Sequence, residues 1–598
     1  MATLGRPETA LSLVSPSPSE VELRGALYRG LWSYNSEWQL VPVIAEAVPT
    51  LGDGSLSFPD GKRRISVRVR REEEKPVYFW SDGTPVKGSD YLTAFQLTTS
   101  LPLLANRQPE WRQTVASVQC SGDLLEVQFV SMWPDAGLEW PPFPTSLGDS
   151  GLIAGGMSRL TREYGRRPLC NGPYFIERWE GDGRLIQLKA NPHFPWPEAG
   201  PPIPRIELRG YDRPERLIRA LVRRDVQLAP RIPLRLLGEL TSVPDLTTRS
   251  VVSTNLKTLI LRTDAPVLRD VRVRRAIFAG LQRNDWVGQV HPEVTVEPAR
   301  SWLPEQAGAY RPVLIDLEDP QTAHREAERL LAEAGFTGKA PRRKGRLELK
   351  LELMYDADSE VDGVIVAHLA HYCEQIGIVL DPKPVRSELL ASRLQRRNFP
   401  HMALTNQPLT PWLNPARLFS NRYLPELRAD GRNYSGWADP KNERLCELIE
   451  AAPDPESRDA ALELQQDYFA SELPFIPLYF VPELHAVHRT VVGYRPTGFG
   501  PTTWNVETWK LDAKAVPVVD PSLHPPVPTP GAGTSGTPLE TPASATPGPP
   551  LTTPATPTAG TTPAATTTPS ATPAAATPAG RSSAPTPNRT PRAEPPAR

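Results

Sequence analysis

The sequence is poor in cysteine and contains no long hydrophobic run. Its 598 residues include four cysteines, Cys120, Cys170, Cys373 and Cys446, which lie far apart without any C-x-x-C pair. This spacing argues against a zinc ribbon, a thioredoxin-like dithiol and a disulfide-dense scaffold. No apolar run approaches the roughly 18 residues of a membrane-spanning helix, so none is expected. The cysteine content does not indicate whether the protein lies inside or outside the cytoplasm.

The chain also lacks an excess of either charge. It has 67 Lys and Arg against 68 Asp and Glu, which gives a formal net charge of -1. Binding to nucleic acid or to an anionic membrane usually needs a basic surface. Neither partner is therefore expected.

Familiar catalytic signatures are missing as well. There is no G-x-S-x-G elbow, no H-E-x-x-H and no Gly-rich loop that leads into Lys-Ser/Thr. His368 and His371 stand three apart on a predicted helix and would suit a metal, but Cys373 points elsewhere on it, so a partly exposed helix face is favoured. We expect no enzyme, no cofactor and no metal; an enzyme built on the two histidines is the least favoured alternative.

The composition changes near Ala515. Residues 514–598 consist mainly of Pro, Thr, Ala, Ser and Gly and cannot bury enough apolar surface to fold, which predicts a disordered, Pro-rich tail. Within it, Gly531–Gly536 reads GAGTSG and formally matches a dinucleotide-binding fingerprint. No strand precedes this segment and no helix follows it, so we regard the match as accidental.

The first 514 residues have the pattern of a mixed α/β protein. Strands are predicted at 185–190, 256–263 and 347–355, where apolar residues run together or alternate. Asp270 is predicted to cap a helix with three arginines on its outer side, Arg272, Arg274 and Arg275. A second helix is predicted to open at Asp319 and Pro320 and to close at Gly335. The buried face of this second helix is expected to consist of Ala327, Leu330, Leu331 and Ala334. The buried face of the first helix is expected to consist of Val273, Ile277, Gly280 and Leu281.

The stretch SDGTPVKGSD, residues 81–90, has the aspartates and glycines that a metal-binding loop could contain. It lacks the alternating oxygen ligands and terminal Glu of a calcium loop. Asp82 and Gly83 instead suit a tight turn, and Ser89 or Asp90 suits the start of a helix that carries Leu92 and Phe95 inward. Both aspartates are therefore expected to be architectural.

Five stretches, taken in order, resemble the family 5 extracytoplasmic solute-binding proteins, which deliver oligopeptides, dipeptides, nickel chelates and some sugars to ABC importers. Each stretch is similar to a family signature. One such motif would be weak evidence for the family, whereas five in the family's order are specific evidence. They are WSDGTPVKGSDYLTAF, NGPYFIERWEGDGRLIQLKANPHFPW, DVRVRRAIFAGLQRNDWV, AERLLAEAGF with AHLAHYCEQIGIVL, and LPFIPLYFVPELHAVHRTVVGY.

The resemblance implies a two-lobed α/β fold like that of periplasmic binding proteins, with an extra inserted domain. Lobe I would comprise residues 1–38, 167–263 and 484–513, domain II residues 39–166, and lobe III residues 264–483. A peptide or other small polar solute would be trapped at the hinged interface and passed to an ABC permease, and the protein is expected to be a monomer. Ligands often bind at such interfaces, because closure desolvates both walls together.

The sequence departs from the family at the solute pocket. The family's "G-W-x-x-D-x-x-D-P" stretch corresponds to QPLTPWLNP, residues 407–415, in which Pro411 replaces the Asp that pairs with a peptide amine in peptide binders. A buried ammonium without a carboxylate is costly, so a free peptide N-terminus is not the expected ligand. The residues expected to bind a neutral polar solute here are Asn406, Gln407, Thr410, Trp412 and Asn414; a degenerate pocket is the alternative.

The resemblance implies two further segments that line the solute pocket. They are the loop that holds Ser15 and Ser17, and the strand that holds Tyr479 and Phe480; turn formation and core packing are the competing explanations. The family is extracytoplasmic, although no basic-apolar export signal is visible at the start of this sequence, and one is expected upstream of a misassigned start unless the protein is cytoplasmic. A sensor or scaffold that has lost its solute is the alternative function.

Overall fold

The computed structural model describes residues 1–35, 37–101, 111–130, 141–148, 156–411, 413–428 and 430–515. The chain divides into two compact units, Met1–Pro528 and Thr529–Arg598, and all described residues belong to the first. The predicted tail, apart from residues 514 and 515, lies outside the described residues, as do Gly531–Gly536. The account that follows concerns the first unit.

Helices and strands alternate along this unit. The helices are α1 (Pro18–Leu27), α2 (Gly88–Ser100), α3 (Trp111–Thr114), α4 (Thr145–Gly148), α6 (Gly156–Glu163), α7 (Pro214–Val222), α8 (Leu237–Thr241), α9 (Val271–Gly280), α10 (Arg283–Val290), α11 (Pro320–Glu333), α12 (Glu360–Gln375), α13 (Ser387–Gln395), α14 (Ala416–Phe419), α15 (Pro440–Ala451) and α16 (Pro455–Glu472).

The strands form three larger sheets and several hairpins. They are β1 (Ala2–Leu4), β2 (Trp32–Tyr34), β3 (Leu40–Pro42), β4 (Leu56–Ser57), β5 (Arg64–Arg68), β6 (Arg71–Glu72), β7 (Lys75–Pro76), β8 (Val115–Ser121), β9 (Leu124–Phe129), β10 (Tyr174–Glu180), β11 (Leu185–Ala190), β12 (Arg205–Tyr211), β13 (Leu228–Ile232), β14 (Leu246–Leu261), β15 (Arg343–Lys344), β16 (Leu347–Glu348), β17 (Lys350–Asp356), β18 (Val379–Val385), β19 (Met402–Pro408), β20 (Phe475–His488), β21 (Val491–Val492) and β22 (Lys510–Leu511).

The predicted strands agree with these elements in position. The strand predicted at 185–190 is β11. The one predicted at 256–263 is the second half of a much longer strand, β14, and the one at 347–355 is divided between β16 and β17. The largest sheet has the order β13-β20-β14-β19-β17-β18, and the others are β1-β12-β11-β10 and β4-β5-β9-β8. The mixed α/β class is therefore confirmed.

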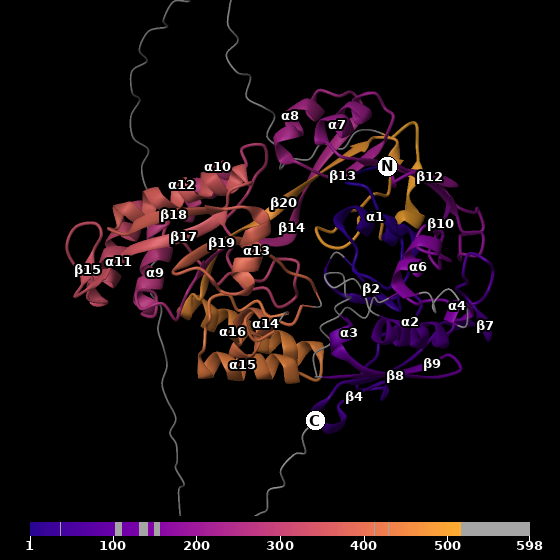
Figure 1. Ribbon diagram of the computed structural model, residues 1–598, viewed down its shortest axis with the longest axis horizontal. Coiled ribbons are helices and arrows are strands. Elements are labelled where there is room, and N and C mark those ends of the chain that lie inside the picture. Colours follow the sequence, from indigo (N-terminus) through magenta and orange to yellow (C-terminus); the bar gives the residue numbers. More distant parts are fainter. Residues whose placement is uncertain are drawn as a thin grey trace, which may run out of the picture. The chain divides into compact units, whose positions relative to one another are not determined.

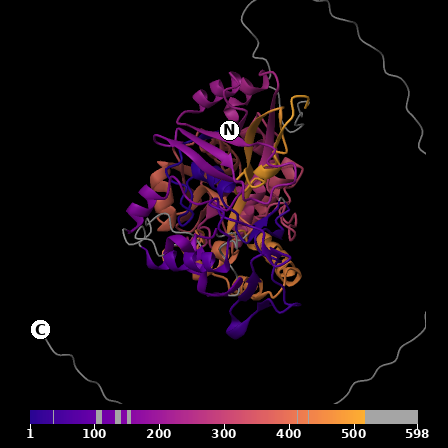
Figure 2. The same ribbon diagram turned by 90° about the vertical axis from the view of Figure 1, so that its right-hand side faces the viewer.

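The largest sheet separates two hydrophobic clusters. Alternate residues of β14 point to opposite faces: Leu259 and Leu261 pack with Trp286, whereas Leu256 and Ile260 pack with Phe419. We call these the Trp286 cluster, which is completed by α9 to α12, and the Phe419 cluster, which is completed by α14 to α16. Helices α7 and α8 lie near the top of Figure 1, beyond β13, and their magenta ribbons are again at the top of Figure 2.

Both predicted helix starts are confirmed. Asp270 accepts a hydrogen bond from Arg272 N at 3.0 Å, and Asp319 accepts from Thr322 N at 2.9 Å with Pro320 at the first helical position. Gly335 follows α11 with φ of 89°, a conformation that glycine adopts at little cost. Gly280 allows α9 to approach α12, because a Cβ there would lie 2.7 Å from Ile376 Cδ1. The faces predicted to be buried on both helices are buried.

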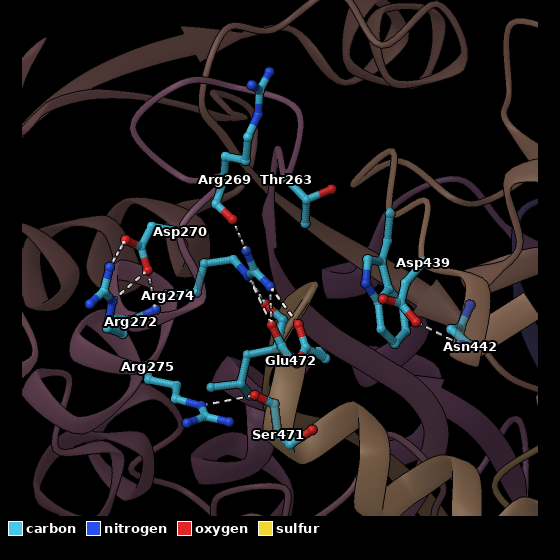
Figure 3. A network of polar contacts seen from close by, with 12 residues as sticks. Thr263, Arg269, Asp270, Arg272, Arg274, Arg275, Asp439, Asn442, Ser471 and Glu472 are labelled. Carbon is cyan, nitrogen blue, oxygen red and sulfur yellow. Dashed lines mark hydrogen bonds and ion pairs between the residues drawn. The ribbon is translucent and has the colours of Figure 1, made fainter. Parts of the chain in front are cut away.

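The prediction that Arg274 points outward is wrong. Its side chain is buried at 3% exposure and donates to Glu472 O at 2.8 Å and to Leu268 O at 2.9 Å (Figure 3). The carbonyl groups at the end of α16 have no helical partners, and a guanidinium with five N–H donors satisfies several of them at once. The sequence pattern predicted an exposed side chain because arginine is charged, and it could not show the backbone carbonyl groups that surround Arg274.

The stretch 81–90 is architectural, as predicted. Exposed Asp82 accepts from Thr84 N at 2.9 Å and so holds the turn. Asp90, which is 3% exposed, accepts from Lys87 N at 3.0 Å and from Trp80 Nε1 at 2.9 Å. It also accepts from Thr145 N at 2.8 Å. Asp90 therefore joins the start of α2 to the aromatic segment before it and to α4.

We expect Asp90→Asn to lower the free energy of unfolding by about 2 kcal/mol, because an amide replaces a carboxylate that accepts several hydrogen bonds in a buried place. Asp82→Asn is the matched control and should cost less than about 1 kcal/mol. Urea unfolding of both variants measures the difference. Equal effects at the two positions would contradict the assigned role of Asp90.

Candidate functional site

Two long strands cross the largest sheet side by side. β14 pairs antiparallel with β20 from Leu246↔His488 to Ile260↔Phe475, with an irregularity between Val252 and Leu256. Beyond that irregularity β14 also pairs with β19, and before it β20 pairs with β13. The two strands therefore join the part of the sheet next to α7 and α8 to the part that holds β17 to β19 (Figure 1).

This pairing brings four of the predicted site residues together. Lys257 of β14 lies opposite Asn406 on one side and Tyr479 on the other. Leu256 lies opposite Gln407 and Phe480 in the same way. Residues paired across strands share a face, so Gln407, Leu256 and Phe480 form a row on the side of the Phe419 cluster.

Gln407 and Asn406 differ in what surrounds them. Asn406 is exposed, whereas Gln407 is 2% exposed. The Gln407 amide donates through Nε2 to Thr258 Oγ1 at 3.4 Å, and its Oε1 atom is buried without a hydrogen-bond partner in the described part of the chain. A buried acceptor without a partner costs free energy, which makes this position unusual among core residues.

The other predicted residues of this segment lie after β19. Thr410 is half-buried, and its carbonyl oxygen accepts from Leu413 N at 3.0 Å. Asn414 is 1% exposed, accepts from Ala416 N at 2.9 Å at the start of α14 and donates to Glu450 Oε1 at 2.7 Å. These bonds are structural, because they fix α14 against α15. Trp412 lies outside the described residues.

Ser15 and Ser17 belong to the segment that leads into α1. Ser17 is the residue before the helix, and its backbone N–H donates to Glu20 Oε2 at 2.8 Å. Ser15 precedes this cap by two residues. The bonds described for Ser17 stay within its own segment, so its role in a pocket remains a prediction.

A partly buried ionic network that sequence reasoning missed connects α1 to the crossing strands. Arg231 of β13 pairs with Glu22 of α1 and, through Nε at 3.1 Å, with Glu483 of β20. Glu22 is 2% exposed and also accepts from Thr502 N at 2.8 Å. Burial raises the pKa of Glu483, and the nearby Arg231 opposes that change. Three distant segments are thus held together by charge beside β20.

A second polar cluster lies on the Trp286 side of β14. Lys257 Nζ binds Asp362 Oδ1 of α12 at 2.6 Å, and both side chains are almost fully buried, at 6% and 3% exposure. Next to Lys257, Tyr479 Oη lies 3.2 Å from His291 Nε2. The signal in the sequence was Lys257, the single charged residue within the mainly apolar strand segment LKTLIL.

Burial and the charge of Lys257 lower the pKa of His291 to about 4, so this ring is neutral in the folded protein. In the unfolded chain it titrates near about 6.5, and the unfolded state therefore binds more protons between these values. We expect stability to fall as the pH drops from about 6.5 to about 4, with a slope of up to about 1.4 kcal/mol per pH unit from this group.

The comparison of His291→Gln with wild type tests this expectation by urea unfolding across pH 4 to 7. The variant should lose part of the slope, whereas His371→Gln, on an exposed position of α12, should keep it. A slope that is unchanged in His291→Gln would contradict the assignment.

The histidine pair on α12 has ordinary neighbours. His368 stacks on Trp286 with ring centroids 5.2 Å apart, and His371 Nε2 lies 2.9 Å from Gln375 Nε2. Cys373 is buried on another side of the helix. No group of three or more metal-binding side chains comes together among the described residues.

The described ranges also contain no helix that is both long enough and apolar enough to cross a bilayer.

Comparison with known proteins identifies the fold first. The chain has the α/β fold of periplasmic binding proteins: it matches the oligopeptide-binding protein AppA of Bacillus subtilis, solved with a nonapeptide, over 86% of this chain and 98% of that one, with 18% identity and a TM-score of 0.61. The chain belongs to the bacterial extracellular solute-binding proteins, family 5, whose model matches residues 76–423. The resemblance inferred from the five motifs is thereby confirmed.

Two curated relatives share less than a quarter of their aligned residues with this chain. The chain is 22% identical over 507 residues to the probable deoxycholate-binding periplasmic protein YgiS of Escherichia coli, which covers 78% of this chain and 85% of that protein. It is 23% identical over 312 residues to the probable monoacyl phosphatidylinositol tetramannoside-binding protein LpqW of Mycobacterium tuberculosis, which covers 50% of this chain and 45% of that protein. All of these relatives are binding proteins.

Proposed function

We propose that the protein binds a small solute between its lobes, closes over it and presents it to an ABC permease outside the cytoplasm. Membership of the solute-binding family supports the binding role. The observation that carries the placement of the site is the row of Gln407, Leu256 and Phe480, in which one end of a buried amide has no partner in the described structure. A bound solute would supply that partner.

The solute is not a peptide held by its free amine. The position that carries an aspartate in the family's peptide binders is Pro411 here, and Gln407 beside it is uncharged. A buried ammonium needs a carboxylate, and Glu483 of β20, like Glu22, is already bound to Arg231. Recognition therefore rests on uncharged hydrogen-bonding groups and apolar surface.

The predicted domain boundaries fit this proposal in outline. Lobe I (residues 1–38, 167–263 and 484–513) and lobe III (residues 264–483) would share the largest sheet through β14 and β20, with domain II (residues 39–166) inserted in the first. Paired strands that pass from one lobe to the other bend at irregular places, and the break in pairing between Val252 and Leu256 is one such place.

Calorimetric titration of wild type with three solutes tests binding: the peptide Ala-Ala-Ala, deoxycholate, and lysophosphatidylinositol. At least one should bind, and small-angle scattering should then show a more compact protein. Gln407→Leu should weaken that binding about tenfold, the equivalent of one hydrogen bond of about 1.4 kcal/mol. Gln306→Leu is the matched control, because its Oε1 is also buried without a partner but lies outside the row.

Failure of all three solutes to bind would contradict the proposal, as would binding that leaves the scattering unchanged. The latter outcome would favour a sensor or scaffold with the same fold.

A further inference from the structure

Thr254 ties three segments together at the break in β14. Its backbone N–H donates to Gly498 O at 3.1 Å, and its hydroxyl donates to Leu409 O at 2.5 Å. The loop that carries Phe499 and the end of β19 therefore meet beside β14, within two residues of Leu256. The row that contains Gln407 is adjacent to this junction.

Trp38 reaches the same place from a different part of the chain. It stands in the turn between β2 and β3 with φ of 61°, a left-handed conformation that is unfavourable for a bulky residue. Asn35 holds the turn, since its Oδ1 accepts from Gln39 N at 2.8 Å. The indole packs on the Phe419 cluster and meets Phe499 edge-on, with centroids 6.0 Å apart.

Two polar atoms in this region are buried without a hydrogen-bond partner in the described structure. They are a donor, Trp38 Nε1, and an acceptor, Gln407 Oε1. Gln407 lies opposite Leu256, on the face of the sheet that packs on the Phe419 cluster. Both groups are uncharged, and the aromatic rings of Trp38, Phe480 and Phe499 belong to the same region. Unmatched polar atoms among apolar rings are costly unless a ligand pairs with them.

We infer that this region is the solute site and that Trp38 helps to select the solute, which is a hydroxylated amphiphile. Its apolar face packs on the indole and the phenyl rings. A hydroxyl or carbonyl oxygen of the solute accepts from Trp38 Nε1, and a hydroxyl group donates to Gln407 Oε1, while any charged end of the solute stays in water. This inference rests on the proposed function and names the class of solute.

The chemistry explains why such a solute is preferred over a peptide. A short peptide of small residues is polar along its whole length and would leave the aromatic surface uncovered. A solute with one apolar face and a few hydroxyl groups satisfies both requirements, because the site offers one donor and one acceptor among apolar side chains. Deoxycholate has this distribution of groups, as does lysophosphatidylinositol.

The test compares Trp38→Phe and Trp38→Ala with Trp504→Phe in titrations with the same three solutes. Trp38→Phe keeps an aromatic ring and removes an N–H group that has no partner in the protein, so it should bind the amphiphiles about fivefold more weakly with an unchanged melting temperature. Trp504 Nε1 donates to Arg495 O at 2.7 Å, so Trp504→Phe should lower the melting temperature and keep the affinity. Trp38→Ala should weaken binding more than tenfold.

A spectroscopic reading completes the test. The indole N–H resonance of Trp38, assigned by its absence in Trp38→Phe, should shift when deoxycholate is added to wild type. If a solute binds but the Trp38 variants retain full affinity, or if Ala-Ala-Ala binds and the amphiphiles do not, this inference is wrong while the proposed function stands. If wild type binds none of the three solutes, both are wrong.

Discussion

Lys257→Met should lower the free energy of unfolding by about 3–5 kcal/mol, because it leaves the carboxylate of Asp362 buried without its cation. The pair joins β14 to α12 at 2.6 Å, and neither side chain has more than 6% exposure. Desolvation of the remaining charge, rather than loss of the attraction alone, accounts for the size of the effect. Urea unfolding measures it directly.

The double variant Lys257→Met with Asp362→Leu should recover most of the loss, since no uncompensated charge then remains. The exposed pair Lys383–Asp381, 3.0 Å apart with 46% and 32% exposure, is the matched control, and Lys383→Met should cost less than about 1 kcal/mol. Equal penalties for the two lysines would show that burial of the Lys257 pair has no energetic consequence.

The second large effect is expected at Arg231. Arg231→Met removes the cation that serves both Glu22 and Glu483, and it should cost about 2–3 kcal/mol at pH 8, mainly because Glu22 is 2% exposed and loses its cation. Burial already raises the pKa of Glu483, and loss of Arg231 raises it further. In the variant this carboxyl group therefore becomes protonated as the pH falls from 8 toward 5. The penalty should therefore be smaller at pH 5 than at pH 8.

The double variant Arg231→Met with Glu483→Gln should restore part of the stability at pH 8 and lose most of that pH dependence. Arg205→Met serves as the control, because Arg205 is 67% exposed and pairs with Glu177 at 3.2 Å on the surface. A penalty at Arg231 that grows toward pH 5 would show that Glu483 is not the group in question.

The interpretation of the network also depends on its histidine. His485 lies 3.6 Å from Glu483, but burial and nearby arginines lower the pKa of His485 to about 3. The ring is therefore neutral at pH 5 and at pH 8, and its Nδ1 atom lies 2.8 Å from Tyr494 Oη. The pH dependence expected at Arg231 thus belongs to Glu483 rather than to this imidazole.

Local signals were sufficient to predict much of the fold. An aspartate before a helix acts through its own backbone neighbours, so Asp270 and Asp319 were identifiable from a few residues. Strand positions followed from apolar runs for the same reason. The family was identifiable because five short motifs keep their order, although each of them alone reports only a turn, a cap or a buried strand.

Features that depend on distant segments were not predictable in this way. Arg274 is buried because the end of α16, nearly 200 residues later, presents carbonyl groups to it. Lys257 needs Asp362, and Arg231 needs Glu22, partners that no local pattern connects.

The placement of the candidate site combines both kinds of signal. The resemblance pointed to the strands with Gln407 and Phe480, and only the structure revealed their pairing with β14. The described bonds of Asn414 hold α14 and α15 together, and its role toward a solute remains a prediction. Trp38, which we propose as a site residue, could not be identified from the sequence because its position depends on a turn and on Phe499, more than 400 residues away.

Hydrogen–deuterium exchange of the full chain, with and without saturating deoxycholate below its micelle-forming concentration, tests the central claim most directly. Binding at the proposed site predicts slower exchange in residues 35–39, 252–258, 406–409 and 479–480, and little change in α10 to α12. Unchanged exchange in these four segments, or protection confined to α10 to α12, would contradict the claim that the protein binds its solute where β14, β19 and β20 meet.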